Sequence, residues 1–127
     1  YLLDVNALVA WGQQRSPQHV AFHTWAKQHS FAELTTCAHV ELGFIRISMQ
    51  VFGDSLADAQ TQLAAMKRVT GEFVTAAPSP KLAAWAKRSS LTSDAYLAQV
   101  AASAGLLLAT FDTSIPHATR IIRTSTS

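Results

Sequence analysis

The sequence predicts an α/β fold, a three-layer α/β/α sandwich with a mainly parallel central sheet. Short apolar segments typical of strands alternate with helical segments along the chain, which favours parallel strands joined by helices. One late segment, residues 106–111, is continuously apolar, as expected of a strand covered on both faces. The 127 residues have the length of one average domain, and no repeat or linker divides them, so we expect a single domain over residues 1–127.

The composition indicates a folded protein with a sizeable core. Apolar residues make up 49% of the chain and charged residues only 14%, against roughly 25% charged in typical soluble proteins. These values exclude an intrinsically disordered chain. The single cysteine, Cys37, excludes an intrachain disulfide framework and indicates a reducing compartment. Because the sequence has neither a signal-peptide pattern nor an apolar run of ~18 residues, we expect a cytoplasmic protein without a membrane span.

The first half of the chain is expected to alternate between strands and helices. Asn6 can cap a short helix after the apolar opening segment. Ser16 followed by Pro17 is a strong helix start, because proline is favoured at the first helical position. The expected elements are a strand over 1–5, a helix over 7–12, a helix from 17 to about 29, a strand over 31–36 and a helix from about 37 to 51.

The second half continues the alternation. Residues 53–55, Gly-Asp-Ser, break the preceding helix and cap the next one, and Thr92 and Ser93 can cap a later helix. Gly105 is expected to end that helix as a left-handed residue. The expected elements are a helix from 56 to about 69, a strand over 72–76, a short helix over 82–86, a helix over 94–104, and strands over 106–111 and 120–123.

Four of the eight acidic residues fall at ends of predicted strands or starts of predicted helices. Asp4 ends the first strand, Asp112 ends the late apolar strand, and Asp94 and Glu41 lie near helix starts. The helix that begins at Asp94 advances ~16 Å and the next strand returns ~20 Å, so Asp112 comes back to the level of Asp94. If the first strand is parallel to that strand, Asp4 ends at the same edge, and Glu41 starts from it. Ligands of open α/β sheets bind at this edge.

The convergence of these carboxylates predicts a metal site, because clustered negative charges stay ionised only with a compensating charge. Helix N-termini near Glu41 and Asp94 supply part of that charge. A divalent cation would supply the rest, and ligation by oxygen alone suits Mg²⁺ or Mn²⁺ rather than Zn²⁺. Such an ion activates water and polarises phosphoryl oxygens, so the cluster points to phosphodiester hydrolysis. Any one of the four carboxylates could by itself be a helix cap or a solvated residue.

Basic residues supply candidates for contact with nucleic acid. The net charge of +2 and the isoelectric point near 9.0 are compatible with an anionic partner without being diagnostic of one. Arg46 follows Glu41 on the same predicted helix, and Lys87 and Arg88 precede the helix of Asp94. We therefore take Arg46, Lys87 and Arg88 as candidates for RNA contact, with plain solvation as the alternative. His39 carries no signal of its own.

The residues around the four carboxylates resemble the PIN-domain ribonucleases, and among them the bacterial VapC-type toxins of toxin–antitoxin pairs. The similarity covers nearly the whole chain in order, and its motifs are specific only when taken together. They are Leu2-Leu3-Asp4-Val5-Asn6, Glu41-Leu42, Asp94-Ala95-Tyr96-Leu97 and Leu108-Ala109-Thr110-Phe111-Asp112.

This resemblance implies cleavage of RNA that depends on Mg²⁺ or Mn²⁺, on an α/β/α sandwich. It implies an acidic, metal-binding catalytic site formed by Asp4, Glu41, Asp94 and Asp112, with Asn6 and Thr110 supporting it through hydrogen bonds. It also implies a homodimer and a cognate antitoxin whose C-terminal segment covers the active groove. Asn6 stands where many relatives carry Ser or Thr. No residue beyond Asp112 is carried over, because Thr113 and Ser114 depart from the family pattern.

We therefore expect an endoribonuclease that is the toxin of a toxin–antitoxin system. One alternative is a catalytically silent module that binds RNA or protein on the same fold. Another is a phosphatase with an aspartyl nucleophile, which requires a second acid two residues after the first. That position holds Asn6, so the general acid of such a phosphatase is missing.

Overall fold

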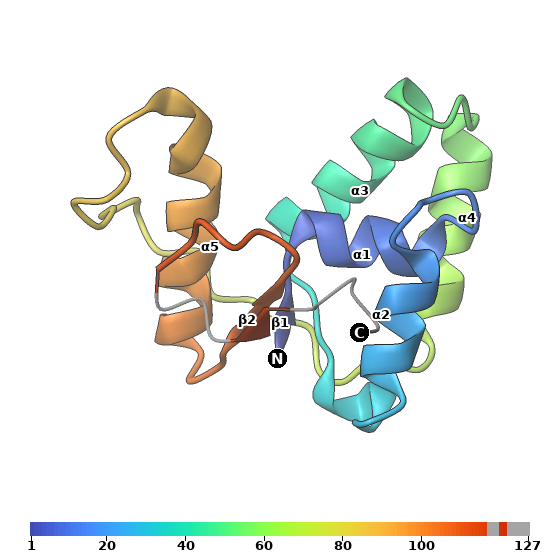
Figure 1. The fold of residues 1–127 in the computed structure, drawn as a ribbon, viewed down its shortest axis with the longest axis horizontal. Helices are drawn as coiled ribbons and strands as arrows, with labels where there is room; N and C mark the ends of the chain where they lie inside the picture. The colour runs from blue at the N-terminus through green and yellow to red at the C-terminus, as the bar shows by residue number, and fades with distance from the viewer. Residues whose placement is uncertain (117–119, 122–127) are drawn as a thin grey trace.

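A parallel sheet lies at the centre of the computed structural model, which describes residues 1–116 and 120–121 (Figure 1). In this part of the chain the strands are β1 (Leu2–Leu3), β2 (Leu108–Thr110) and β3 (Arg120–Ile121), in the order β1-β2-β3. Both pairings are parallel, with Leu2 opposite Leu108 and Ala109 opposite Arg120. The predicted parallel sheet is confirmed, and residues 122–123 of the predicted last strand lie outside the described residues.

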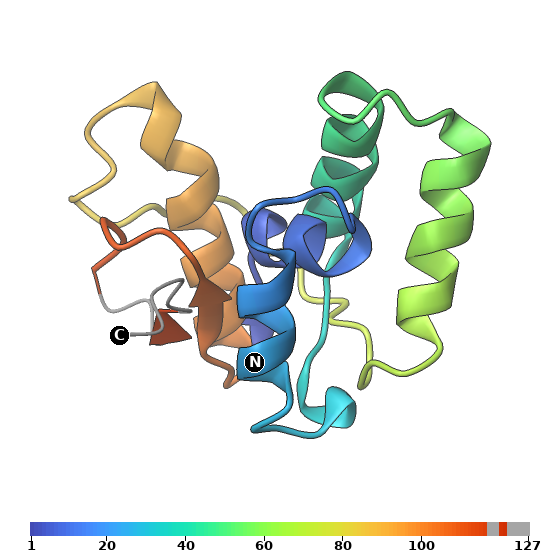
Figure 2. The same cartoon turned by 45° about the vertical axis from the view of Figure 1, so that its right-hand side comes forward.

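Helices cover the sheet on two sides, which confirms the three-layer arrangement. Helix α5 packs against β2 on one side, and α1 contacts β1 and β2 on the other, with α2, α3 and α4 gathered around it (Figures 1 and 2). None of the helices in the described residues is long and apolar enough to cross a membrane. Their bounds are α1 (Val5–Gly12), α2 (His19–Ala26), α3 (Ala38–Gln50), α4 (Leu56–Lys67) and α5 (Thr92–Ser103), with short 3₁₀ helices η1 (Phe31–Glu33) and η2 (Ser89–Leu91).

The strands predicted over 31–36 and 72–76 are reduced to single parallel bridges, Leu2 to Thr35 and Cys37 to Val74. The first prediction fails at its start because residues 31–33 form η1, which a capping box stabilises. Ser30 accepts a hydrogen bond from the Ala32 backbone, and Glu33 accepts one from the Ser30 backbone, 2.8 Å long. These local bonds satisfy backbone groups that a strand would otherwise pair.

Two further predictions about helices are corrected. The short helix predicted over 82–86 is a turn, and the segment before it is tied to α5 by Gln99, whose side chain accepts from the Lys81 backbone and donates to the Ser79 carbonyl. Helix α1 is capped by Asp4 rather than Asn6, because the Asp4 carboxylate accepts from the Val5 backbone at 2.7 Å. Gly105, which follows the C-cap residue of α5, has the predicted left-handed conformation, with φ of +70°.

Helices α1 and α3 approach closely at a glycine. A Cβ atom at Gly43 would lie 2.8 Å from the Cγ2 atom of Val5, so a larger residue would force the helices apart. Because Val5 directly follows Asp4, this contact sets the face of α3 that carries Gly43 against the end of β1. The largest fully buried side chains of the core are Phe22, Phe44, Leu2, Leu3, Leu8, Leu34, Leu97 and Leu108.

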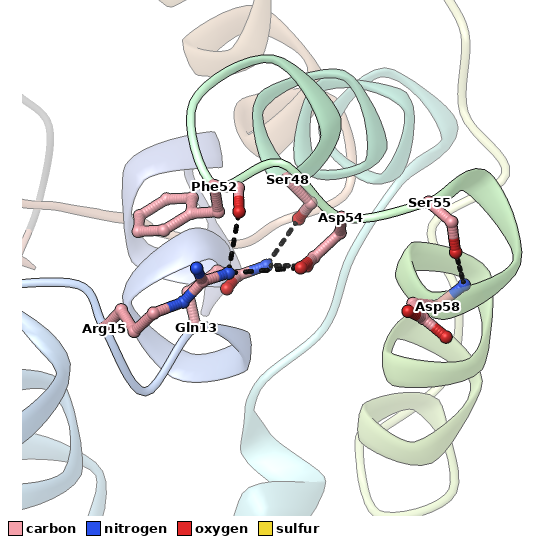
Figure 3. A network of polar contacts seen from close by, with 7 residues as sticks. All are labelled: Gln13, Arg15, Ser48, Phe52, Asp54, Ser55 and Asp58. Carbon is pink, nitrogen blue, oxygen red and sulfur yellow. Dashed lines mark hydrogen bonds and ion pairs between the residues drawn. The ribbon is translucent and has the colours of Figure 1, made fainter.

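A polar network fastens the end of α1 to the connection between α3 and α4 (Figure 3). The buried Gln13 amide donates to Ser48 Oγ at 3.0 Å and to Asp54 Oδ2 at 2.6 Å. Asp54 Oδ1 also pairs with the exposed Arg15 guanidinium at 3.1 Å, and Arg15 donates to the Phe52 carbonyl at 2.8 Å. The network therefore holds the far end of α3, away from the sheet.

Candidate active site

Asp4 lies where β1 ends, and its carboxylate is both buried and hydrogen-bonded. The residue is 3% exposed. Its Oδ1 atom accepts from the Val5 backbone at 2.7 Å, and its Oδ2 atom accepts from Thr110 Oγ1 at 2.7 Å. Burial raises the pKa of Asp4, because it disfavours the charged form, and these two hydrogen bonds offset part of that rise.

The Thr110 hydroxyl on β2 joins Asp4 to the surrounding chain. It donates to Asp4 and accepts from the Asn6 amide at 3.1 Å and from the Asp112 backbone at 3.0 Å. One donor hydrogen and two lone pairs are thereby used, which fixes the hydroxyl. Asn6 also accepts from the Phe111 backbone at 3.1 Å. Asn6 and Thr110, the predicted supporting residues, thus tie the ends of β1 and β2 together.

Asp94 and Asp112 bring further negative charge close to Asp4. Asp94 lies in the first turn of α5 and is half-buried. Its burial, together with the charges of Asp4 and Asp112, raises the pKa of Asp94 to about 6. Asp112 follows β2, and its Oδ1 atom accepts from the Ser114 backbone and hydroxyl at 2.8 and 2.7 Å. Three carboxylates from distant segments therefore act on one another.

A cavity of about 340 Å³ opens between α1, α3 and α5, and of the three aspartates Asp4 and Asp94 line it whereas Asp112 does not. Arg46 of α3 contributes a cation to its wall, so the cavity combines carboxylates with a guanidinium. Lys87 and Arg88 are exposed and do not line it. The polar residues on its wall are Asp4, Asn6, Gln18, Arg46, Ser93 and Asp94.

Glu41, which the sequence predicts to join the three aspartates, does not line this cavity. Its Oε2 atom accepts from Thr36 Oγ1 at 2.6 Å and lies 3.1 Å from Lys67 Nζ of α4. Residues two apart on a helix lie about 200° apart around its axis. Because Gly43 faces Val5 and the end of β1, Glu41 faces α4 instead. The charges that act on Asp4 include those of Asp112, Asp94 and His39.

The aspartates have the donor chemistry of a magnesium or manganese site. Among the described residues, no three His, Cys, Asp or Glu side chains are grouped closely enough to hold one metal ion. Carboxylate oxygens are nevertheless the ligands that Mg²⁺ and Mn²⁺ prefer. The repulsion that raises the pKa of Asp94 is also what a bound cation would relieve. Asp4, Asp94 and Asp112 therefore fit a divalent cation in charge and chemistry.

Comparison with known proteins shows the family. Residues 1–121 match the PIN domain family. The chain belongs to the PIN-domain family. It is 34% identical over 125 residues to the ribonuclease VapC39 of Mycobacterium tuberculosis, and this match covers 90% of this chain and 89% of that protein. It is 30% identical to the ribonuclease VapC38 of the same organism, over 90% of this chain and 86% of that protein.

A solved structure agrees with the PIN-domain fold. The crystal structure of Mycobacterium tuberculosis VapC20, a toxin described as cleaving the sarcin–ricin loop, superposes with a TM-score of 0.65. The two chains are 16% identical, and the match covers 96% of this chain and 97% of that one. With the sequence relatives, this match identifies the chain as a PIN-domain protein of the VapC type.

The site of this PIN domain includes a histidine that the sequence analysis did not single out. His39 lies in the first turn of α3, and its Nε2 atom is 2.7 Å from Ser93 Oγ, next to Asp94. Helix periodicity was the available signal, because residues 39, 43 and 46 share one face of α3. Gly43 contacts Val5 at the end of β1, and Arg46 on the same face lines the cavity. His39 does not line this cavity, but its charge acts on Asp4.

Proposed function

We propose that this PIN-domain protein is an endoribonuclease dependent on Mg²⁺ or Mn²⁺, and the toxin of a toxin–antitoxin pair. The observation that carries the proposal is the set of charges around Asp94. Burial, together with the charges of Asp4 and Asp112 from the ends of β1 and β2, raises the pKa of Asp94 to about 6. Burial and repulsion that disfavour a charged carboxylate are common at functional sites, and a bound cation would offset both.

The chain's own residues have distinct tasks in this proposal. When bound, Mg²⁺ or Mn²⁺ supplies positive charge that lowers the pKa of water and stabilises negative charge on phosphate oxygens. Asp4, Asp94 and Asp112 hold that charge in place, and Thr110 and Asn6 orient Asp4. Glu41 would join them only by leaving Lys67.

Arg46 provides a guanidinium on the wall of the same cavity, where it can pair with a phosphate of the RNA backbone. A water oxygen forms the new bond to phosphorus, and the bond from phosphorus to the leaving ribose oxygen breaks. The leaving oxygen then takes a proton, so the products are one phosphate end and one hydroxyl end. Lys87 and Arg88 remain candidates for contacts with more distant phosphates.

The partners of the protein are also part of the proposal. The names of the relatives, which call VapC39 and VapC38 ribonucleases and VapC20 a toxin, support an RNA substrate and a cognate antitoxin. The homodimer, and the antitoxin's C-terminal segment over the groove, are proposed from the family resemblance alone. The open cavity beside Asp4 and Asp94 is where a covering segment would block access.

The two alternative functions are less well supported. An aspartyl-nucleophile phosphatase needs a second acid two residues after the first, but this position holds Asn6, whose amide donates to Thr110 Oγ1 at 3.1 Å. A silent binding module would not need the charge repulsion around Asp94. It remains the outcome to be tested against.

Replacement of Asp4 by Asn tests the proposed activity. Asparagine is also a good N-cap, so α1 should keep its start while the charge is lost. We expect Asp4→Asn to reduce Mn²⁺-dependent cleavage of RNA by about 100-fold or more. The assay compares RNA ends with Mn²⁺ and with chelator.

The matched control is Asp58→Asn, which removes an exposed carboxylate from the first turn of α4. This variant should cleave like the wild type. Full activity of Asp4→Asn, or cleavage that persists in chelator, would contradict the proposed chemistry.

A further inference from the structure

The cavity on the far side of His39 from the acidic site has the character of a base-binding pocket. It has a volume of about 420 Å³, within the usual range for ligand pockets, and a mainly apolar wall. Two aromatic rings stand in this wall, those of His39 and Tyr96, with Pro80 and Leu82 beside them. Its residues are His39, Pro80, Leu82, Thr92, Ser93 and Tyr96, and we call it the His39–Tyr96 cavity.

The two rings do not stack on each other. Their centroids are 5.9 Å apart and their planes meet at 66°, edge to face rather than stacked. In an edge-to-face pair, the ring that presents its edge has neither of its two faces covered by the partner ring. The Tyr96 hydroxyl donates to the Pro78 carbonyl at 3.0 Å, so the tyrosine is anchored by its polar end. An anchored ring loses little conformational freedom when a flat ligand stacks on it.

The wall opposite α5 is also held in place. The segment from Pro78 to Leu82 has no regular structure, yet three hydrogen bonds fasten it to α5. Two of these come from Gln99, which accepts from the Lys81 backbone at 2.8 Å and donates to the Ser79 carbonyl at 2.9 Å. The cavity is thus built by side chains of α5.

Ser93 connects this cavity to the acidic site, since it lines both. Its hydroxyl bonds to His39 at 2.7 Å, and the next residue is Asp94. Consecutive nucleotides of an RNA strand carry their bases beside the phosphates that join them. A phosphate held among Asp4, Asp94 and Arg46 would therefore place a neighbouring base at the His39–Tyr96 cavity.

From this geometry we infer that the His39–Tyr96 cavity binds one unpaired nucleobase of the RNA substrate, next to the phosphate that is cleaved. This inference rests on the proposed ribonuclease function. Proteins recognise single-stranded RNA by stacking its bases on Tyr, Phe, Trp and His side chains. The Thr92 and Ser93 hydroxyls at the rim offer hydrogen-bond partners for the edge of the base.

The experiment compares two probes of equal length and charge in chelator, where cleavage does not interfere. One is a fluorescein-labelled single-stranded RNA of eight nucleotides, and the other is the same sugar-phosphate chain without bases. Affinities are measured by fluorescence anisotropy at fixed pH and salt. Stacking of one base contributes about 5- to 150-fold in affinity. The wild type should prefer the base-bearing RNA by at least about fivefold.

The variants separate ring stacking from hydrogen bonding. Tyr96→Leu and His39→Ala should each reduce the preference for bases about fivefold or more. Tyr96→Phe loses only the bond to Pro78 and should keep the preference. The matched control is His29→Ala, which removes a histidine that packs against Tyr1 and Trp25 and does not line the cavity.

Four results would overturn the inference. An unchanged preference in a folded Tyr96→Leu variant would mean that bases bind elsewhere. A change of oligomeric mass in that variant, with the preference unchanged, would assign the cavity to a protein interface. Failure of the wild type to bind either probe, both in chelator and with Mn²⁺, would overturn the proposed function as well, whereas binding of both probes equally would overturn this inference alone.

Discussion

At the scale of single residues, the raised pKa of Asp94 makes the stability of the folded protein depend on pH. Burial and the charges of Asp4 and Asp112 raise its pKa to about 6, from an ordinary value of 3.8. Between these values the folded protein binds a proton that the unfolded chain has lost. The free energy of unfolding therefore decreases as the pH rises from about 4 through 6, and remains lower above pH 6.

Asp94→Asn should make the metal-free protein more stable at neutral pH. The amide carries no charge, so the repulsion is absent above pH 6, while below about pH 4 the two proteins should be equally stable. Because Asp94 is only half-buried, solvent screens much of the repulsion, and we expect a gain below about 1 kcal/mol. Urea denaturation in chelator at pH 4, 5 and 7 measures it. A difference that is independent of pH would contradict this origin.

Much of the site could be predicted from the sequence, because the positions of Asp4, Asp94 and Asp112 depend on chain order alone. Each lies at the end of a parallel strand or the start of a helix, and this topology brings such residues together. The orientation of Glu41 and His39 could not be predicted in the same way. It depends on the rotation of α3 about its axis, which is set by the contact between Gly43 and Val5.

At the scale of elements, the long periodic helices α3, α4 and α5 follow the prediction, and the weak elements do not. The strand predicted over 72–76 and the helix predicted over 82–86 have few residues, so tertiary contacts decide their form. Gln99 of α5 binds the backbone of the segment before residue 82. A sequence pattern of five residues contains no information about such a distant partner.

The network at the far ends of α1 and α3 is the clearest case of tertiary contacts that stabilise elements (Figure 3). Gln13→Ala would leave the buried Ser48 and the half-buried Asp54 without their shared donor. We expect it to lower the free energy of unfolding by about 1–3 kcal/mol.

Arg15→Ala is the matched variant in the same network. The Arg15 side chain is 63% exposed, so loss of its ion pair with Asp54 should cost less than about 1 kcal/mol. Chemical denaturation of both variants gives the comparison. Equal losses would mean that the exposed ion pair, rather than the buried amide, holds the connection between α3 and α4.

At the scale of the whole molecule, the acidic site joins the two sides of the sheet. Asp94 belongs to α5 on one side, whereas Asp4 is the N-cap of α1 on the other, and Asp112 follows β2 between them. Helices α3 and α5 stand apart beyond the sheet (Figures 1 and 2), and the bond between His39 and Ser93 spans them near Asp94. A cation held by the three aspartates would therefore link all three layers.

Binding of Mn²⁺ should consequently stabilise the folded protein as a whole. An ion that binds only the folded state adds about 2.7 kcal/mol at a concentration 100-fold above its dissociation constant, which corresponds to several degrees in Tm. The increase should be smaller at pH 5 than at pH 7, because a proton on Asp94 competes with the ion. Thermal unfolding with Mn²⁺ or chelator measures it, with Asp112→Asn expected to lose most of the increase and Asp58→Asn to retain it. An equal increase in both variants would place the ion outside the acidic site.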